Sequence, residues 1–128
     1  MTHVLDASAL LAYLHDEPGA DDVEDALVAG AVVGAANWSE VLQKVRVRGG
    51  DTRLAVALLD SFDLAVIPVT REDAEAAAAL WQAGRGLSLA DRLCLALGER
   101  LKADVFTADR AWGSGPGIRQ LRGGNDGA

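Results

Sequence analysis

Short apolar runs alternate with amphipathic stretches along almost the whole chain. Apolar or β-branched runs bounded by glycine, proline or acidic residues predict strands, whereas apolar residues three to four positions apart predict helices. Strands are expected at residues 4–5, 31–34, 64–68, 103–106 and, at an edge, 118–121. Helices are expected at residues 9–15, 20–29, 36–48, 51–61, 70–82 and 88–98. This alternation predicts an α/β fold of three layers, α/β/α, with a central parallel sheet of four to five strands, because right-handed crossovers put helices on both faces.

Length and composition limit how the chain is organised. With 128 residues, half of them apolar, it is long enough for one well-buried domain and too short for two. We expect the domain to occupy residues 1–122 and a flexible tail, rich in glycine, to occupy residues 123–128. No apolar stretch approaches the roughly 20 residues that cross a bilayer, and the first residues lack the pattern of a secretion signal. We therefore expect a soluble cytoplasmic protein that does not contact membranes.

The net charge of -7 argues against a protein that holds nucleic acid through its overall field. Three basic residues, Lys44, Arg46 and Arg48, crowd the last turn of the helix predicted at 36–48. There they complement the helix dipole, and the alternative is that they contact RNA phosphates. Cys94 is the only cysteine, so no internal disulfide can form, and its apolar neighbours predict a buried position on a helix that is buried on nearly every side.

Four acidic residues stand at the ends or starts of predicted elements. Asp6 ends the first strand, Asp109 follows the fourth, Asp91 lies in the first turn of a helix, and Glu40 lies one turn inside another. Two parallel strands that each end in Asp suggest neighbours at a topological switch point, where ligands bind in open α/β sheets. We therefore expect these acids to converge there.

Three of these acids also have a structural interpretation. Asp6 can cap the helix that follows it, and Asp91 can complete a cap begun by Ser88. Asn37 and Glu40 have the spacing of a capping box, so spacing alone does not decide between a cap and a ligand.

The chemistry of the four acids favours a hard divalent cation. Clustered carboxylates without a metal would repel one another, and Mg²⁺ or Mn²⁺ prefers oxygen ligands. One or two such ions can activate water and neutralise charge in phosphodiester hydrolysis. His3 and His15 lie apart from the acids, so no zinc site is expected, and neither a Ser-His-Asp arrangement nor a glycine-rich phosphate loop is visible.

Taken in order, these stretches resemble a PIN domain and, more narrowly, the VapC ribonuclease toxins of bacterial toxin–antitoxin pairs. The matching pieces are Val-Leu-Asp-Ala-Ser-Ala-Leu around Asp6, the helix-start acid Glu40, Leu-Ser-Leu-Ala-Asp-Arg-Leu around Asp91, and Phe-Thr-Ala-Asp-Arg-Ala-Trp around Asp109. The resemblance covers nearly the whole chain and makes residues 1–122 a PIN-like nuclease domain. It implies that these four acids are the catalytic metal ligands.

The same resemblance implies a mechanism and partners. The protein would be an Mg²⁺- or Mn²⁺-dependent endoribonuclease that cleaves tRNA or another structured RNA, forms a homodimer and is inhibited by a cognate antitoxin. Asp6 and Asp109 would bind the principal ion, while Asp91 and Glu40 complete the site or orient water. Four further residues would assist: Ser8 and Thr107 as polar support, and Arg92 or Arg110 on a phosphate.

Other protein classes fit less well. A receiver-type phosphoacceptor domain would have paired acids after the first strand, but Asp6 has no acidic neighbour. A HAD-type phosphatase would have a second Asp where Ser8 stands. A catalytically inactive PIN-like module that binds RNA or protein remains the alternative. Trp38, Trp81 and Trp112 are expected to pack against the fold rather than stack on bases.

Overall fold

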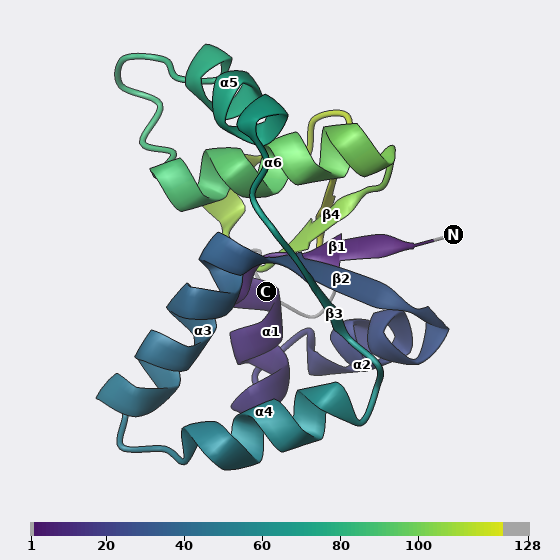
Figure 1. Ribbon diagram of the computed structural model, residues 1–128. Helices are drawn as coiled ribbons and strands as arrows, with labels where there is room; N and C mark the ends of the chain where they lie inside the picture. Colours follow the sequence, from purple (N-terminus) through teal and green to yellow (C-terminus); the bar gives the residue numbers. More distant parts are fainter. Residues whose placement is uncertain (1, 122–128) are drawn as a thin grey trace.

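The computed structural model describes residues 2–121, so the tail predicted at 123–128 lies outside the described residues. Five parallel strands form one sheet in the order β3-β2-β1-β4-β5 (Figure 1). The strands are β1 (His3–Leu5), β2 (Ala31–Gly34), β3 (Ala65–Ile67), β4 (Val105–Thr107) and β5 (Ile118–Gln120). The helices are α1 (Ala7–Leu14), α2 (Ala20–Ala29), α3 (Ala35–Val47), α4 (Thr52–Asp60), α5 (Arg71–Ala79) and α6 (Leu89–Leu101), with a 3₁₀ helix, η1 (Arg110–Trp112).

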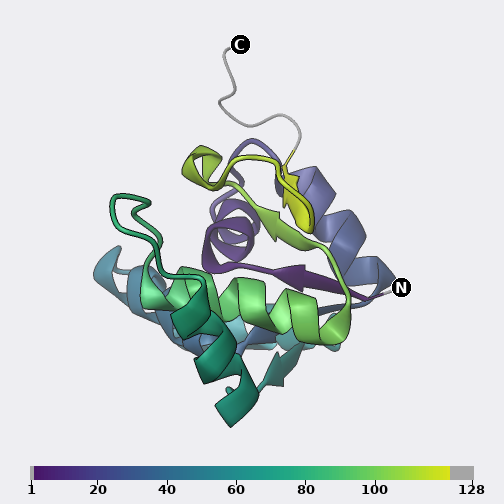
Figure 2. The ribbon, with the colours of Figure 1, turned by 90° about the horizontal axis from the view of Figure 1, so that it is seen from above.

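Helices cover both faces of the sheet, which confirms the predicted three layers. One hydrophobic cluster joins α1 to α4 with inward residues of the strands such as Leu5 and Val33. A second cluster joins α6 with the residues that point the other way, such as Val4 and Val105. Seen from above, α6 lies along one side of β1 and β4, and α1 and α2 lie along the other (Figure 2). Alternate strand residues feed the two clusters because successive side chains in a strand point to opposite faces.

The order of the strands places a switch point at the centre of the sheet. The chain runs from β1 outward through β2 to β3 and then returns to β4 on the other side of β1. In the register of β1 and β4, Leu5 lies opposite Phe106. The residues that follow this pair, Asp6 and Thr107, therefore emerge side by side at the carboxyl ends of neighbouring strands, as the position of Asp6 and Asp109 in the sequence predicted.

Several predicted boundaries differ from the structure for local reasons. Helix α1 begins at Ala7, two residues earlier than predicted, and Asp6 caps it. Helix α3 is capped at Gly34, so Asn37 lies inside it and the capping box that its spacing from Glu40 allowed does not form. Helix α5 ends at Ala79, which leaves Trp81 62% exposed, whereas Trp112 is buried as predicted.

The predicted burial of α6 is correct for one face only. Cys94 and Leu97 are buried, and Cys94 is fully so, as expected. Leu89 and Leu101 are 59% and 38% exposed, so the helix is not buried on nearly every side. Gly98 brings α6 close to the sheet: a Cβ added there would lie 2.6 Å from Val105 Cγ2. The helix thus packs tightly at its centre and projects at both ends.

Candidate functional site

Asp6 is a buried carboxylate fixed by neighbours on both strands of the switch point. Its side chain is 3% exposed. Thr107 Oγ1 donates to Asp6 Oδ2 at 2.6 Å, and the backbone N–H of Ala9 donates to Oδ1 at 2.8 Å. Ser8 Oγ lies 2.8 and 3.0 Å from the two carboxylate oxygens and donates to them. These bonds hold the carboxylate in one orientation at the start of α1.

Two hydroxyl groups connect Asp6 with the segment that carries Asp109. Ser8 Oγ accepts from the N–H of Ala108 at 2.9 Å, and Thr107 Oγ1 accepts from the N–H of Asp109 at 3.0 Å. The two hydroxyl oxygens lie 3.2 Å apart. The structure therefore places Ser8 and Thr107 directly on the Asp6 carboxylate, between the two strands.

Burial raises the pKa of Asp6 from its ordinary 3.8 to about 6. The hydrogen bonds from Thr107, Ala9 and Ser8 oppose this shift because they favour the charged form. The negative charge of Asp91, on α6, adds to the increase. The charge of Asp91 therefore acts on Asp6, although Asp6 directly follows a strand of the sheet and Asp91 lies on a helix that covers the sheet.

The charges of Glu40 and Asp91 also act on a buried residue of α6, Cys94. Burial raises the pKa of the Cys94 thiol well above its usual range, and the charges of Asp6, Asp91 and Glu40 raise it further. The side chain of Asn37 connects α3 with α6: its Nδ2 lies 3.2 Å from Glu40 Oε1 and 3.4 Å from the carbonyl oxygen of Ala90. The charges of three of the four predicted acids therefore act on the Cys94 thiol.

Asp91 and Asp109 both have capping bonds as well. Ser88 and Asp91 form the predicted capping box at the start of α6, with N–H to oxygen distances of 3.1 Å in both directions. The Asp109 side chain accepts from the N–H of Ala111 at 2.9 Å and caps η1, and Asp109 is exposed. Asp109 is joined to Asp6 through Thr107, rather than through its own carboxylate.

The two arginines predicted to contact phosphate both donate to backbone carbonyls. Arg92 donates to the carbonyl of Ala77 at 2.9 Å, which ties α6 to α5. Arg110 donates to the carbonyl of Leu121 at 3.0 Å, which ties η1 to the residue after β5. Both guanidinium groups thus connect neighbouring segments of the fold.

The donor set fits a hard divalent cation held partly through water. All four predicted ligands offer carboxylate oxygens, the donors that Mg²⁺ and Mn²⁺ prefer. Among the residues that the structure describes, no group of three or more His, Cys, Asp or Glu side chains is placed to hold a metal ion. Mg²⁺ commonly keeps several waters and uses only one or two carboxylates directly, so this arrangement is compatible with a hydrated ion.

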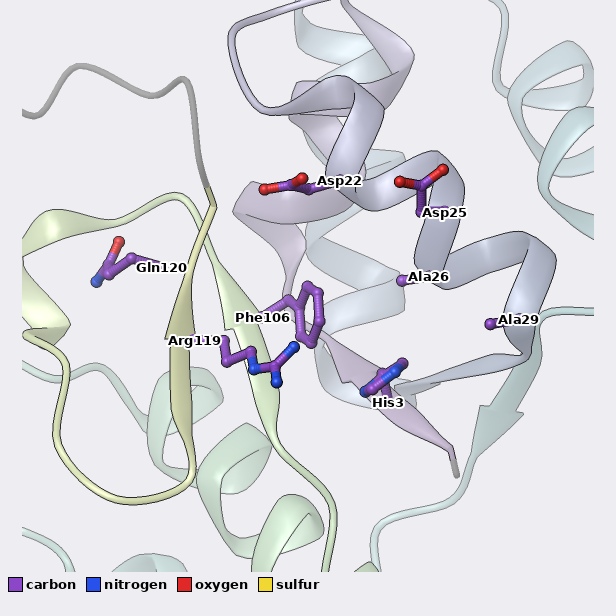
Figure 3. A pocket seen from close by; sticks show the side chains of 8 residues that line it. All are labelled: His3, Asp22, Asp25, Ala26, Ala29, Phe106, Arg119 and Gln120. Atoms are coloured by element: carbon purple, nitrogen blue, oxygen red, sulfur yellow. The ribbon is translucent and has the colours of Figure 1, made fainter.

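Sequence reasoning missed Asn37 as part of this site. Its spacing from Glu40 was considered only as a possible helix cap, but residues three apart inside a helix are also neighbours on its surface. The available signal was an amide side chain three residues before an acidic one. A separate pocket of about 430 Å³ lies between α2 and β5, and His3, Phe106 and Arg119 line it (Figure 3). None of the four predicted acids lines this pocket.

A family model described as PIN domain matches residues 3–114. The chain belongs to the PIN domain family. None of the curated proteins compared with this sequence matches it. In residues 2–121, no helix is long and apolar enough to span a membrane.

Solved structures share this PIN fold at low sequence identity. A chain of a toxin–antitoxin complex from Klebsiella pneumoniae superposes with a TM-score of 0.69 at 21% identity, over 91% of this chain and 95% of that one. A chain of VapBC2 from Rickettsia felis, bound to a DNA fragment from its promoter, gives 0.68 at 15% identity, over 94% and 98%. A chain of DNA-bound VapBC from Salmonella typhimurium gives 0.67 at 15% identity, over 94% and 96%. The PIN domain described here therefore has the complete fold found in these chains.

Proposed function

We propose that this PIN domain is a VapC-type toxin, an Mg²⁺- or Mn²⁺-dependent endoribonuclease that hydrolyses phosphodiester bonds of tRNA or another structured RNA. The observation that carries the proposal is the Asp6 carboxylate. It is buried at the switch point, its pKa is raised to about 6, and the charge of a second acid, Asp91, acts on it. Keeping a charged carboxylate in such a place lowers stability, and a bound cation offsets that effect.

The four acids divide into two pairs in this proposal. Asp6 and Asp109 would hold the principal ion, and Asp91 and Glu40 would complete the site or orient water. One or two bound ions would supply a nucleophilic water and neutralise charge on the phosphate.

The polar neighbours keep the site in order. Ser8 and Thr107 fix the orientation of Asp6 through the hydrogen bonds described above. Arg92 or Arg110 steadies a phosphate, for which its guanidinium group would have to share or exchange its present carbonyl partner.

The proposal extends to partners and location. A cognate antitoxin inhibits the nuclease, the toxin forms a homodimer, and both act in the cytoplasm. Support for the antitoxin comes from the structures that share the fold, several of which are toxin–antitoxin complexes.

RNA cleavage under three conditions tests the proposed activity. The purified protein should cleave a tRNA mixture with Mn²⁺, lose this activity with EDTA, and lose it in the Asp6→Asn variant. Asp60→Asn, which removes an exposed carboxylate at the end of α4, is the matched control and should cleave like the wild type. Equal cleavage in all samples would refute the metal mechanism. A wild type that neither binds Mn²⁺ nor cleaves RNA would instead favour the inactive binding module.

A further inference from the structure

Asn37 is the only buried Asn, Gln, Lys or Arg side chain of the described residues, and its exposed fraction is 1%. It lies in the first turns of α3, where β2 has just ended. A buried amide that is left without hydrogen bonds lowers the stability of a protein by about 1 to 3 kcal/mol. Its partners are therefore informative about why it is there.

The Asn37 amide group serves two acid-bearing helices at once. Nδ2 donates to Glu40 Oε1 at 3.2 Å, on its own helix, and to the carbonyl oxygen of Ala90 at 3.4 Å, on α6. Ala90 directly precedes Asp91 in the first turn of α6. A primary amide has two N–H hydrogens, so one can point to each partner. The same group thus contacts one predicted ligand and the backbone beside another.

Burial adds to these two hydrogen bonds. Asn37 is 1% exposed, so solvent does not compete for the hydrogens of its amide group. The amide is therefore held by Glu40 and by the Ala90 carbonyl. A side chain fixed in this way can transmit a defined geometry to Glu40.

We propose that Asn37 is a positioning residue that sets the orientation of Glu40 and its placement relative to Asp91. This inference rests on the proposed function, because it concerns the same carboxylates. Groups that hydrogen-bond to ligating side chains typically change metal affinity by 10- to 100-fold when they are removed. Without the amide, Glu40 loses its buried donor and rotates freely, while the Ala90 carbonyl loses its link to α3.

The primary test is Mn²⁺ binding by calorimetry, without RNA, for the wild type and Asn37→Ala. We expect the variant to bind Mn²⁺ about 10- to 100-fold more weakly. Val45→Ala is the matched control, because Val45 is a buried residue of the same helix in the cluster that contacts α1 and α4 rather than α6. That variant should be less stable but should bind Mn²⁺ like the wild type.

A double-mutant cycle separates positioning from a general loss of structure. If Asn37 acts through Glu40, Asn37→Ala should weaken Mn²⁺ binding by no more than about 3-fold once Glu40 is already Ala. Full multiplication of the two losses, or an Asn37→Ala affinity equal to that of the wild type, would overturn the inference while leaving the nuclease proposal intact. A wild type that does not bind Mn²⁺ would overturn both.

A second measurement does not require Asn37→Ala to fold. In the ¹⁵N NMR spectrum of the wild type, the Asn37 side-chain amide should exchange slowly with water and should shift in Glu40→Ala. An amide signal that Glu40→Ala leaves unchanged would show that the two side chains do not interact, and it would refute the inference directly.

Discussion

Replacing Asp6 with Asn should make the protein more stable at neutral pH, even though it removes the proposed metal ligand. The pKa of Asp6 is raised from 3.8 to about 6 by burial, so the folded protein holds this proton more tightly than the unfolded chain does. Between those two pH values the contribution of Asp6 to the free energy of unfolding falls as pH rises, and above about pH 6 it stays at its lowest value. An Asn side chain has no charge to bury at any pH.

The size of the effect follows from the same two values. At 1.36 kcal/mol per pKa unit, the difference between 3.8 and about 6 corresponds to about 3 kcal/mol. About 2 kcal/mol of this should develop between pH 4 and pH 7.5. Asn and Asp form hydrogen bonds of different strength at this position, and this difference changes the free energy of unfolding by a similar amount at every pH. They therefore do not affect the pH-dependent part.

Denaturant unfolding at several pH values from 4 to 7.5, with EDTA present, measures this difference. The free energy of unfolding of Asp6→Asn minus that of the wild type should increase by about 2 kcal/mol across the range. Asp60→Asn, at an exposed position, should show no such increase. A difference that stays constant within about 0.5 kcal/mol, or that decreases with pH, would refute the assignment of Asp6 as a buried acid held charged for function.

Three further substitutions test other contacts. Thr107→Val removes the 2.6 Å hydrogen bond to Asp6, so the pKa of Asp6 should rise above about 6. Carboxyl ¹³C NMR measures this pKa, and an unchanged value would contradict the role of the bond. Arg100→Ala leaves Asp73, which is 4% exposed, without the guanidinium 2.8 Å away that holds its pKa low. This should reduce the free energy of unfolding by about 1 to 3 kcal/mol at pH 7. The reduction should shrink as the pH falls toward 3, and an equal loss at both pH values would show that the ion pair is not its cause. Gly98→Ala improves helix propensity by about 1 kcal/mol but adds a Cβ 2.6 Å from the β4 side chain that faces it. The melting temperature should therefore fall. A rise would show that α6 and β4 can separate without penalty.

The sequence was sufficient for the architecture because the repeating apolar pattern is a local property. Strand-and-helix alternation predicted the parallel sheet and its two helical layers, and the Asp residues after two strands predicted where those strands would be neighbours. Local capping chemistry at Ser88 was also predicted, and its capping box with Asp91 is present. These features depend on residues within a few positions of one another, or on the general handedness of crossovers.

Contacts between distant segments could not be predicted in this way. The sequence does not show that Asn37 reaches Ala90, because the two residues are 53 positions apart and no local pattern connects them. Nor does it show that Leu89 is exposed, because an apolar helix covered by only one neighbour has the same composition as a fully buried one.

The amino-acid sequence by itself determined the layers of this protein, the order of its elements and the four acidic residues worth examining. Only the tertiary structure decided which of those acids act on one another, that Asp109 caps a helix, and that Asp6 is buried with a raised pKa. The physical reason is that burial and charge interactions depend on distances through space. These distances are set by how α3 and α6 pack against the switch point, and this packing cannot be predicted from a local sequence pattern.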